Sequence, residues 1–593
     1  MFERSMTDKI QEVTPRDDVE VHLPDGRVYR GARGSPVEKF LQALPEWGDP
    51  PIVGAIINGE LRELTYPITM DSRIQPVTMA DADGARIYRR SLVFLLETAF
   101  EDLFPGAELT VDHSVSSGGY FCQVSGRDPL TQEELRRLEQ RMRELVEQDL
   151  PLVRRQVPLD EAIEYFQRKG QYDKVRLLKY RTKEHLVLYS MDGHLDYHHG
   201  YMVPSTGYIR WFGLRLEHQN GFIVRFPRRH APKELLPMPD YPTLLQTFRQ
   251  YGRWLTRLGI ENVGALNDAI VNGHVREIIL VSEALHEQRI AEIAEQFVSK
   301  AEHPRIILIA GPSSSGKTTF SKRLAVQLLA HGVSPYALEL DNYFVDREKT
   351  PRDENGAYDF ESLDAVDRER LQSDLRRLID GEEVQLPRFD FKLGLSQPGD
   401  LVRLEKDQII ILEGIHGLNP HLLPGFPMEK TFRIYVSCLT QLNLDRYNRI
   451  STTDSRLLRR IVRDARERGY TAQTTISRWE SVRRGEKRHI FPYQENADVM
   501  FNSALVYELA VLKAEVEPLL RQVPYGAPEY IEAKRLLAFL EWFLPANKDL
   551  IPDNSIIREF IGGSILREFQ LWDRKIITSG ESTVPAASDL RAR

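Results

Sequence analysis

The sequence predicts a multidomain α/β protein whose second half holds a parallel sheet flanked by helices. The first observation is length, because 593 residues are several times the size of one ordinary domain. The second is an apolar run at residues 305–310, which leads into a glycine-rich loop and then into the helical periodicity of residues 319–331. The third is a pair of apolar runs, at residues 336–340 and 408–412, each followed by an acid, as expected where strands of an α/β sheet end at a ligand-binding edge.

Composition narrows the class of protein. Hydrophobic residues make up 41% of the chain and charged residues 28%, which is typical of a soluble globular protein. The net charge of -8 gives no overall electrostatic reason to bind nucleic acid. Two cysteines, Cys122 and Cys438, lie in no metal-ligand spacing and form no disulfide framework. Because the N-terminus is polar and no apolar run has membrane-spanning length, we expect a cytoplasmic protein with no membrane partner.

The glycine-rich loop has the pattern G-x-x-x-x-G-K-T. Its glycines let the backbone wind tightly, so that successive N–H groups point at phosphate oxygens beside the N-terminus of the next helix. We expect Lys317 to reach the β- and γ-phosphates of ATP, and the Thr318 hydroxyl to bind Mg²⁺. The residues predicted to bind the nucleotide are Gly311, Ser313, Ser314, Ser315, Gly316, Lys317, Thr318 and Thr319.

The acids that follow the two later apolar runs are Asp341 and Glu413. Transfer of a phosphoryl group to a hydroxyl requires a residue that orients the hydroxyl and accepts its proton, and Asp341 is the predicted base. Glu413 is expected to serve the metal, directly or through water. The predicted magnesium ligands are therefore Thr318, Asp341 and Glu413.

Together these motifs resemble the uridine kinase and phosphoribulokinase superfamily of P-loop kinases, over residues 305–504. Besides the glycine loop, the resemblance rests on Asp341-Asn-Tyr343-Phe344, on residues 387–391 (PRFDF) and on an arginine-rich segment at 459–469 (RRIVRDARERG). It implies an enzyme that transfers the γ-phosphate of ATP to a hydroxyl of a nucleoside-like acceptor. Residues 446–490 carry 13 Lys/Arg and 5 Asp/Glu, which suits a lid that neutralises phosphate charge. By this resemblance Lys317, Arg463 and Arg468 contact the transferred phosphate, and Arg460 lies nearer the acceptor.

The acceptor pocket departs from the family pattern. The residues that we expect to bind the acceptor are Tyr343, Glu361, Phe389, Phe391, Arg460 and Tyr470. In uridine kinases four side chains form hydrogen bonds to the edge of the pyrimidine base, and here their positions are taken by Phe389, Gly394, Tyr470 and Arg478. The sequence therefore does not identify uridine as the acceptor. The aromatic rings of Phe389, Phe391 and Tyr470 would still stack on a base.

The first half resembles the N-terminal part of threonyl-tRNA synthetases. Residues 17–80 alternate short β-type runs with turns around a short helix, which resembles the ubiquitin-like TGS domain. Residues 83–228 resemble the α+β editing domain through segments 130–135, 159–166 and 203–207. In the synthetases four positions of this domain hold the histidine and cysteine side chains of the editing site. Of these four positions only one, at His198, still carries a side chain of that kind, and Arg90, Phe94 and Met202 stand at the other three. We expect an inactive domain that still offers a surface for RNA or a regulatory ligand, and we interpret His194, His198 and His199 as a polar loop rather than a metal site.

The remaining segments complete the predicted organisation. The predicted units are a flexible N-terminus (1–16), a TGS-like domain (17–80), an editing-like domain (83–228), a helical connector (229–302), a P-loop kinase-like domain (303–505), a helical extension (506–578) and a disordered tail (579–593). The extension is expected to pack on the kinase-like domain or to form a homo-oligomer interface.

Two alternatives to a nucleoside kinase stay open. The first is a kinase of another small hydroxylated metabolite, resembling phosphoribulokinase or pantothenate kinase. The second is an RNA- or ribosome-associated protein in which the P-loop domain is a nucleotide-driven switch. An acceptor base at Asp341 favours the enzyme, because a switch needs no such base.

Overall fold

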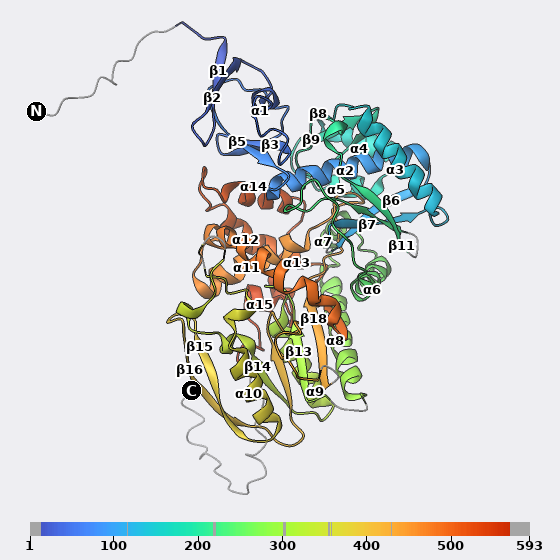
Figure 1. The fold of residues 1–593 in the computed structure, drawn as a ribbon. Coiled ribbons are helices and arrows are strands. Elements are labelled where there is room, and N and C mark those ends of the chain that lie inside the picture. The colour runs from blue at the N-terminus through green and yellow to red at the C-terminus, as the bar shows by residue number, and fades with distance from the viewer. Residues whose placement is uncertain are drawn as a thin grey trace, which may run out of the picture.

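The computed structural model describes residues 14–569 apart from 116, 218–220, 301–303, 354, 355, 357, 428 and 429. The predicted disordered tail and nearly all of the predicted flexible N-terminus lie outside these residues. The multidomain α/β prediction is confirmed, with a parallel sheet in the second half and mixed or antiparallel sheets in the first. Figure 1 shows the N-terminal sheet at one end of the molecule and the parallel sheet toward the other.

The N-terminal sheet has five strands in the order β2-β1-β5-β3-β4 and packs on one short helix. Its elements are β1 (Asp18–His22), β2 (Val28–Ala32), α1 (Val37–Leu41), β3 (Ile52–Ile57), β4 (Glu60–Arg62) and β5 (Ser72–Thr78). In β1 the side chains alternate between the two faces, so that Val19 and Val21 are buried against Phe40 of α1.

The next region surrounds the long helix α2 (Ala82–Leu103), which is buried along most of its length. A four-stranded antiparallel sheet contains β6 (Glu108–Val115), β7 (Gly119–Ser125), β11 (Gly213–Glu217) and β12 (Gly221–Arg225). A three-stranded sheet contains β8 (Val153–Pro158), β9 (His185–Met191) and β10 (His194–Asp196). The flanking helices are α3 (Gln132–Glu147), α4 (Leu159–Arg168) and α5 (Tyr172–Leu178).

The segment between the editing-like region and the parallel sheet contains α6 (Pro242–Leu258), α7 (Val263–Val271) and α8 (Val275–Val298). It leads into a five-stranded sheet in the order β14-β17-β13-β18-β19, in which every pairing is parallel. The strands are β13 (Ile306–Ala310), β14 (Pro335–Glu339), β17 (Ile409–Glu413), β18 (Thr431–Ser437) and β19 (Val499–Asn502). All residues of β13 are buried, which is why the strand reads as an unbroken apolar run.

Helices and a hairpin complete this second half. Its helices are α9 (Lys317–Ala330), α10 (Arg368–Ile379), α11 (Thr452–Arg468) and α12 (Ala472–His489), and the hairpin is β15 (Glu383–Asp390) with β16 (Leu395–Arg403). The C-terminal extension contributes α13 (Glu508–Leu520), α14 (Tyr530–Leu540) and α15 (Arg558–Ile561). Both α13 and α15 pack on α11. No helix in the described part of the chain combines the length and the apolar character needed to cross a bilayer.

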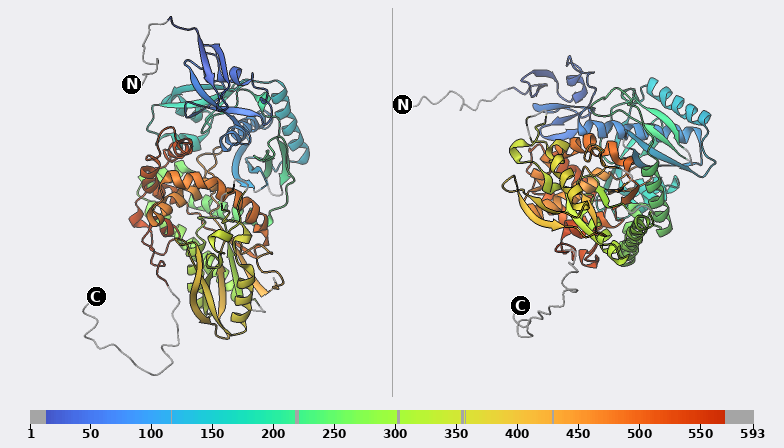
Figure 2. Two further views of the ribbon diagram at one scale, coloured as in Figure 1. Left: turned by 60° about the vertical axis from the view of Figure 1, so that its left-hand side comes forward. Right: turned by 60° about the horizontal axis from the view of Figure 1, so that its bottom comes forward.

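The two halves share one hydrophobic core. A single cluster of buried side chains runs from α4 and α5 through the connector and the parallel sheet to the C-terminal helices. Polar contacts cross the same boundary: Glu60 of β4 pairs with Lys534 of α14, and Arg86 of α2 pairs with Glu532. Figure 2 shows the N-terminal region resting against the second half in both further views. The halves therefore fold as one packed body.

We predict that Asn267→Ala destabilises the protein by about 2–4 kcal/mol, because two buried backbone groups lose their partner. The Asn267 side chain is fully buried; it donates to the carbonyl of Trp542 at 2.8 Å and accepts from the amide of Leu544 at 2.9 Å. Chemical denaturation of both proteins measures the difference. The matched control is Asn272→Ala, which removes an exposed amide at the end of the same helix. Equal stabilities of the two variants would contradict this prediction.

Candidate active site

The glycine-rich loop joins β13 to α9 and has the backbone that the sequence predicts. Gly316 stands at the N-cap of α9 with φ +86°, a conformation that residues with a side chain rarely adopt. A Cβ on Gly311 would lie 1.9 Å from the carbonyl oxygen of Val436 in β18, so only glycine fits there. Strand, loop and helix are thus held close together, and the loop is fixed against the sheet.

The loop presents groups that suit phosphate oxygens. The hydroxyls of Ser314 and Ser315 are buried and have no hydrogen-bond partner among the described residues. The amide of Ser313 donates to Glu486 of α12, and the amide of Thr319 donates to Glu559 of α15, each at 3.2 Å. The amides at both ends of the loop therefore point at positions where an anionic oxygen can sit, and a phosphate-binding loop needs donors placed in this way.

Thr318, Lys317 and Glu413 meet at the carboxyl edge of the sheet. The Thr318 hydroxyl donates to Glu413 at 3.1 Å, and the Lys317 ammonium lies 3.8 Å from the same carboxylate. The pKa of Glu413 is raised to about 7. Burial is the main cause, nearby acids with Asp341 first among them add to the shift, and Lys317 opposes it. A divalent cation would offset this crowding of negative charge, so the Thr318 and Glu413 oxygens fit a magnesium ion.

Asp341 lies in a short 3₁₀ turn (Leu340–Tyr343) directly after β14. Its side chain reaches solvent, yet the surrounding protein raises its pKa by desolvation. The positive charges that lower this pKa are those of Lys317, Arg468 and Arg463, in that order. The predicted base therefore lies in the electrostatic field of three other predicted site residues.

Asp464 organises the arginines of α11. Its carboxylate is buried and pairs with Arg460 at 3.3 Å, with Arg463 at 3.0 Å and with Arg468 at 3.4 Å. Arg460 also donates to the Ser313 hydroxyl at 2.7 Å, so it contacts the phosphate loop rather than only the acceptor side. One carboxylate thus holds three arginines, of which Arg460 contacts the loop.

The predicted acceptor residues are only partly brought together. Glu361 is positioned by α12, because a Cβ on Gly485 would lie 2.2 Å from the Glu361 Cβ. The pKa of Glu361 is raised to about 7. Burial is the main cause, Glu486 adds to the shift, and Arg460 opposes it. Phe389 and Phe391 lie edge to face at 5.1 Å.

Two predicted acceptor residues lie elsewhere. The Tyr343 side chain is buried, and its hydroxyl donates to Asp374 of α10 at 3.2 Å, so it belongs to the packing of the sheet. Tyr470 follows α11 and lies under the guanidinium of Arg478, at 4.7 Å from the ring centre. No described contact joins Tyr470 to Phe389 or Phe391.

The second half of the chain matches a known protein family. Residues 306–510 match the model described as the Phosphoribulokinase / Uridine kinase family. They are a domain of this family. Two solved structures cover 36% of this chain and 98% of their own chains: a putative fructose transport system kinase from Silicibacter sp. TM1040 (18% identical, TM-score 0.26) and a possible uridine kinase from Bacillus stearothermophilus (21% identical, TM-score 0.25).

The N-terminal region is similar to a different enzyme, threonine–tRNA ligase. The ligase of Acidovorax sp. (strain JS42) is 33% identical over 216 residues, which are 35% of this chain and 34% of that protein. The ligase of Methylobacillus flagellatus is 36% identical over 163 residues, or 27% and 26% of the two chains. This chain spans about a third of the length of the first curated relatives that it matches.

In the editing-like region the histidines contact one another's neighbours and a segment of the kinase-family domain. Phe94 packs edge to face on His198, whose ring nitrogen lies 3.1 Å from Glu97. A segment that follows β18 of the kinase-family domain packs against them: the Tyr447 ring lies 6.3 Å from His198, and Asn448 bonds to Tyr197 and His199. Among the described residues no group of three or more His, Cys, Asp or Glu side chains is arranged to hold a metal ion.

Three carboxylates of the site were not predicted from the sequence. Asp464 belongs to the arginine-rich motif, and its place between basic residues was the available signal. Glu486 and Glu559 carry no local signal, because each reaches the loop from a segment more than a hundred residues away.

We predict that Glu559→Ala raises the affinity for ATP by about tenfold, because a phosphate oxygen and the Glu559 carboxylate cannot both accept the Thr319 hydrogen bond. Isothermal titration calorimetry with ATP measures the change. Glu568→Ala, an exposed acid shortly after α15, is the control and should leave the affinity unchanged. An affinity that falls or stays constant in Glu559→Ala would show that the carboxylate does not compete with the nucleotide.

Proposed function

We propose that this protein is an ATP- and magnesium-dependent kinase that phosphorylates a hydroxyl group of a small, nucleoside-like acceptor. The observation that carries the proposal is that Arg460, which Asp464 holds together with Arg463 and Arg468, donates to Ser313 of the glycine loop, while Lys317 and these last two arginines act electrostatically on Asp341. A protein that only binds and releases a nucleotide has no need of a carboxylate at this position.

The charged side chains divide the work of phosphoryl transfer between them. Lys317, Arg463 and Arg468 supply positive charge for the oxygens of the transferred phosphoryl group. Asp341 orients the acceptor hydroxyl and accepts its proton, and its raised pKa makes it a stronger base than an ordinary aspartate. Magnesium, when held by Thr318 and Glu413, neutralises phosphate charge.

Two features of the kinase-family domain support a nucleoside-like acceptor. Glu361 offers a carboxylate oxygen, Oε2, that has no hydrogen-bond partner among the described residues and can accept from hydroxyl groups of a sugar. The Phe391 ring is 58% exposed and lies against Phe389, which gives an aromatic face for a base. A carboxylate and an aromatic face suit a ligand with a hydroxylated and a flat part.

We predict that Asp341→Asn lowers kcat by about 10²–10⁴-fold while ATP still binds, because the amide keeps the shape of the side chain but cannot accept the proton. The assay is a panel of nucleosides and sugar phosphates with ATP and Mg²⁺, followed for phosphorylated products. Asp364→Asn, an exposed acid on the same domain, is the matched control. ATP consumption without any phosphorylated acceptor, equal in both variants, would favour a nucleotide switch.

We predict that Asp464→Asn lowers kcat/KM by about 10–100-fold, because Arg460, Arg463 and Arg468 lose their common partner and with it their positions. Steady-state kinetics with the acceptor found in the panel measure the effect. Glu467→Gln, an acid in the same helix that pairs with Arg466 on the surface, is the control. Unchanged kinetics in Asp464→Asn would show that the arginines do not depend on this anchor.

A further inference from the structure

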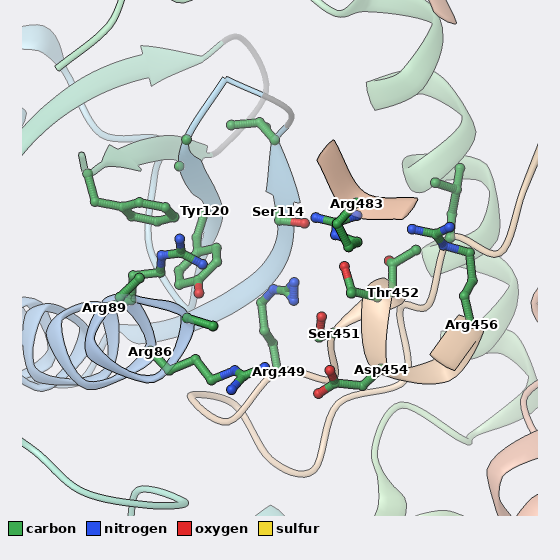
Figure 3. A pocket seen from close by; sticks show the side chains of 18 of the residues that line it. Arg86, Arg89, Ser114, Tyr120, Arg449, Ser451, Thr452, Asp454, Arg456 and Arg483 are labelled. Carbon is green, nitrogen blue, oxygen red and sulfur yellow. The ribbon is translucent and has the colours of Figure 1, made fainter. Parts of the chain in front are cut away.

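A cavity of about 420 Å³ lies between the editing-like region and the kinase-family domain. One wall comes from α2 and from the turn between β6 and β7, and the other from the start of α11 and from α12. Figure 3 shows side chains of both halves facing the same space. Its volume falls within the range of about 300–1,000 Å³ that is usual for small-molecule sites.

The cavity is lined by positive charge that the protein does not neutralise. Arg89 and Arg228 face it from the editing-like side, and Arg449 and Lys487 from the kinase side. None of these four makes an ion pair with a carboxylate of the described residues. The two lining carboxylates, Asp454 and Glu480, are paired instead with Arg535 and Arg229.

The positive side chains also act on one another. The pKa of Lys487 is lowered to about 8 by burial first and then by Arg483, Arg229 and Arg228, against the opposing effect of Glu480. Burial likewise lowers the pKa of Arg228, with further contributions from Arg89 and Arg483. Holding like charges together in a partly desolvated space is unfavourable, so an anion in the cavity would be stabilised by all of them.

The donors of the cavity are held in place. The guanidinium of Arg449 lies 5.0 Å from the ring centre of Tyr120, and that of Arg89 lies 4.9 Å from the ring centre of Phe226. The Nε atoms of Arg89 and Arg449 are buried and have no hydrogen-bond partner among the described residues. These arginines therefore keep unsatisfied donors.

The 17-residue helix α11 adds its N-terminus to the same cavity. Ser451, Thr452 and Thr453 line the cavity, and the N-cap residue Ser451 makes no side-chain cap. The first amides of a helix have no intrahelical acceptor and favour an anion. Figure 3 shows the Ser451 and Thr452 hydroxyls on the side of the cavity that carries Arg449 and Arg483.

We propose that this interdomain cavity binds a small polyanion with at least two phosphate or carboxylate groups, gripped from both halves of the protein. The cavity borders the ATP phosphate loop through Pro312, but its unpaired cations come from outside the loop, and the proposal does not depend on the proposed function. A small ligand is favoured over RNA because the cations are gathered in one bounded cavity, whereas the chain as a whole carries a net charge of -8.

The test is calorimetric titration of inorganic pyrophosphate into the full chain carrying Lys317→Ala, which weakens phosphate binding at the glycine loop. We expect one bound pyrophosphate, with an affinity that falls about tenfold or more in Arg89→Gln and in Arg449→Gln, one variant for each wall. Arg136→Gln on α3, a 70% exposed arginine paired with Glu133, should leave the affinity unchanged.

Thermal unfolding checks that Arg89→Gln and Arg449→Gln still fold. The midpoint of unfolding should not fall in either variant, because each substitution removes one positive charge from a group of side chains that repel one another. Absence of pyrophosphate binding, or binding that is unaffected by both substitutions, would overturn the proposal. A short single-stranded ribo-oligonucleotide serves as the second probe. If it binds more tightly than pyrophosphate and depends on the same two arginines, the occupant is RNA and the small-ligand proposal is wrong.

Discussion

The structure depends on two charged pairs buried under helix α11. The side chains of Arg456 and Arg459 have at most 1% of their surface exposed, and they pair with Glu486 of α12 and Glu508 of α13. A buried charge without its partner is strongly unfavourable, so these pairs fix how the three helices meet. Arg456 also donates to the Ser313 carbonyl at 3.0 Å. The phosphate loop, the arginine-bearing helix and the C-terminal extension are thereby held as one unit.

The glycine-rich loop was predictable from the sequence, because the residues that determine its conformation lie close together in the chain. Gly316 must take a positive φ, the buried strand before it must be apolar, and both requirements appear within a dozen residues. Tyr343 shows the limit of this reasoning. It stands two residues after Asp341, but the 3₁₀ turn directs it to Asp374 instead of the loop. Motif position alone does not say which way a side chain points.

Contacts between distant segments were not predictable in the same way. The substitutions at Arg90 and Phe94 predicted the loss of editing chemistry, and the structure adds that Tyr447 and Asn448 pack against the histidines of this region. Glu559 reaches Thr319 across 240 residues of chain, and no periodicity or spacing records such a pairing. These contacts follow from how the domains pack, which a single sequence does not reveal.

The segment that joins β18 to α11 contacts the editing-like region, which limits how either half can change. Arg446 pairs with Asp173 of α5 at 2.9 Å, and five residues later the chain reaches the N-cap of α11, the helix that carries the site arginines. A substitution here acts on both halves at once. Shuffling the kinase-family domain into another gene would remove the partner of this segment and expose buried rings such as Tyr447. A change in the packing surface of one half is therefore limited by the shape of the other.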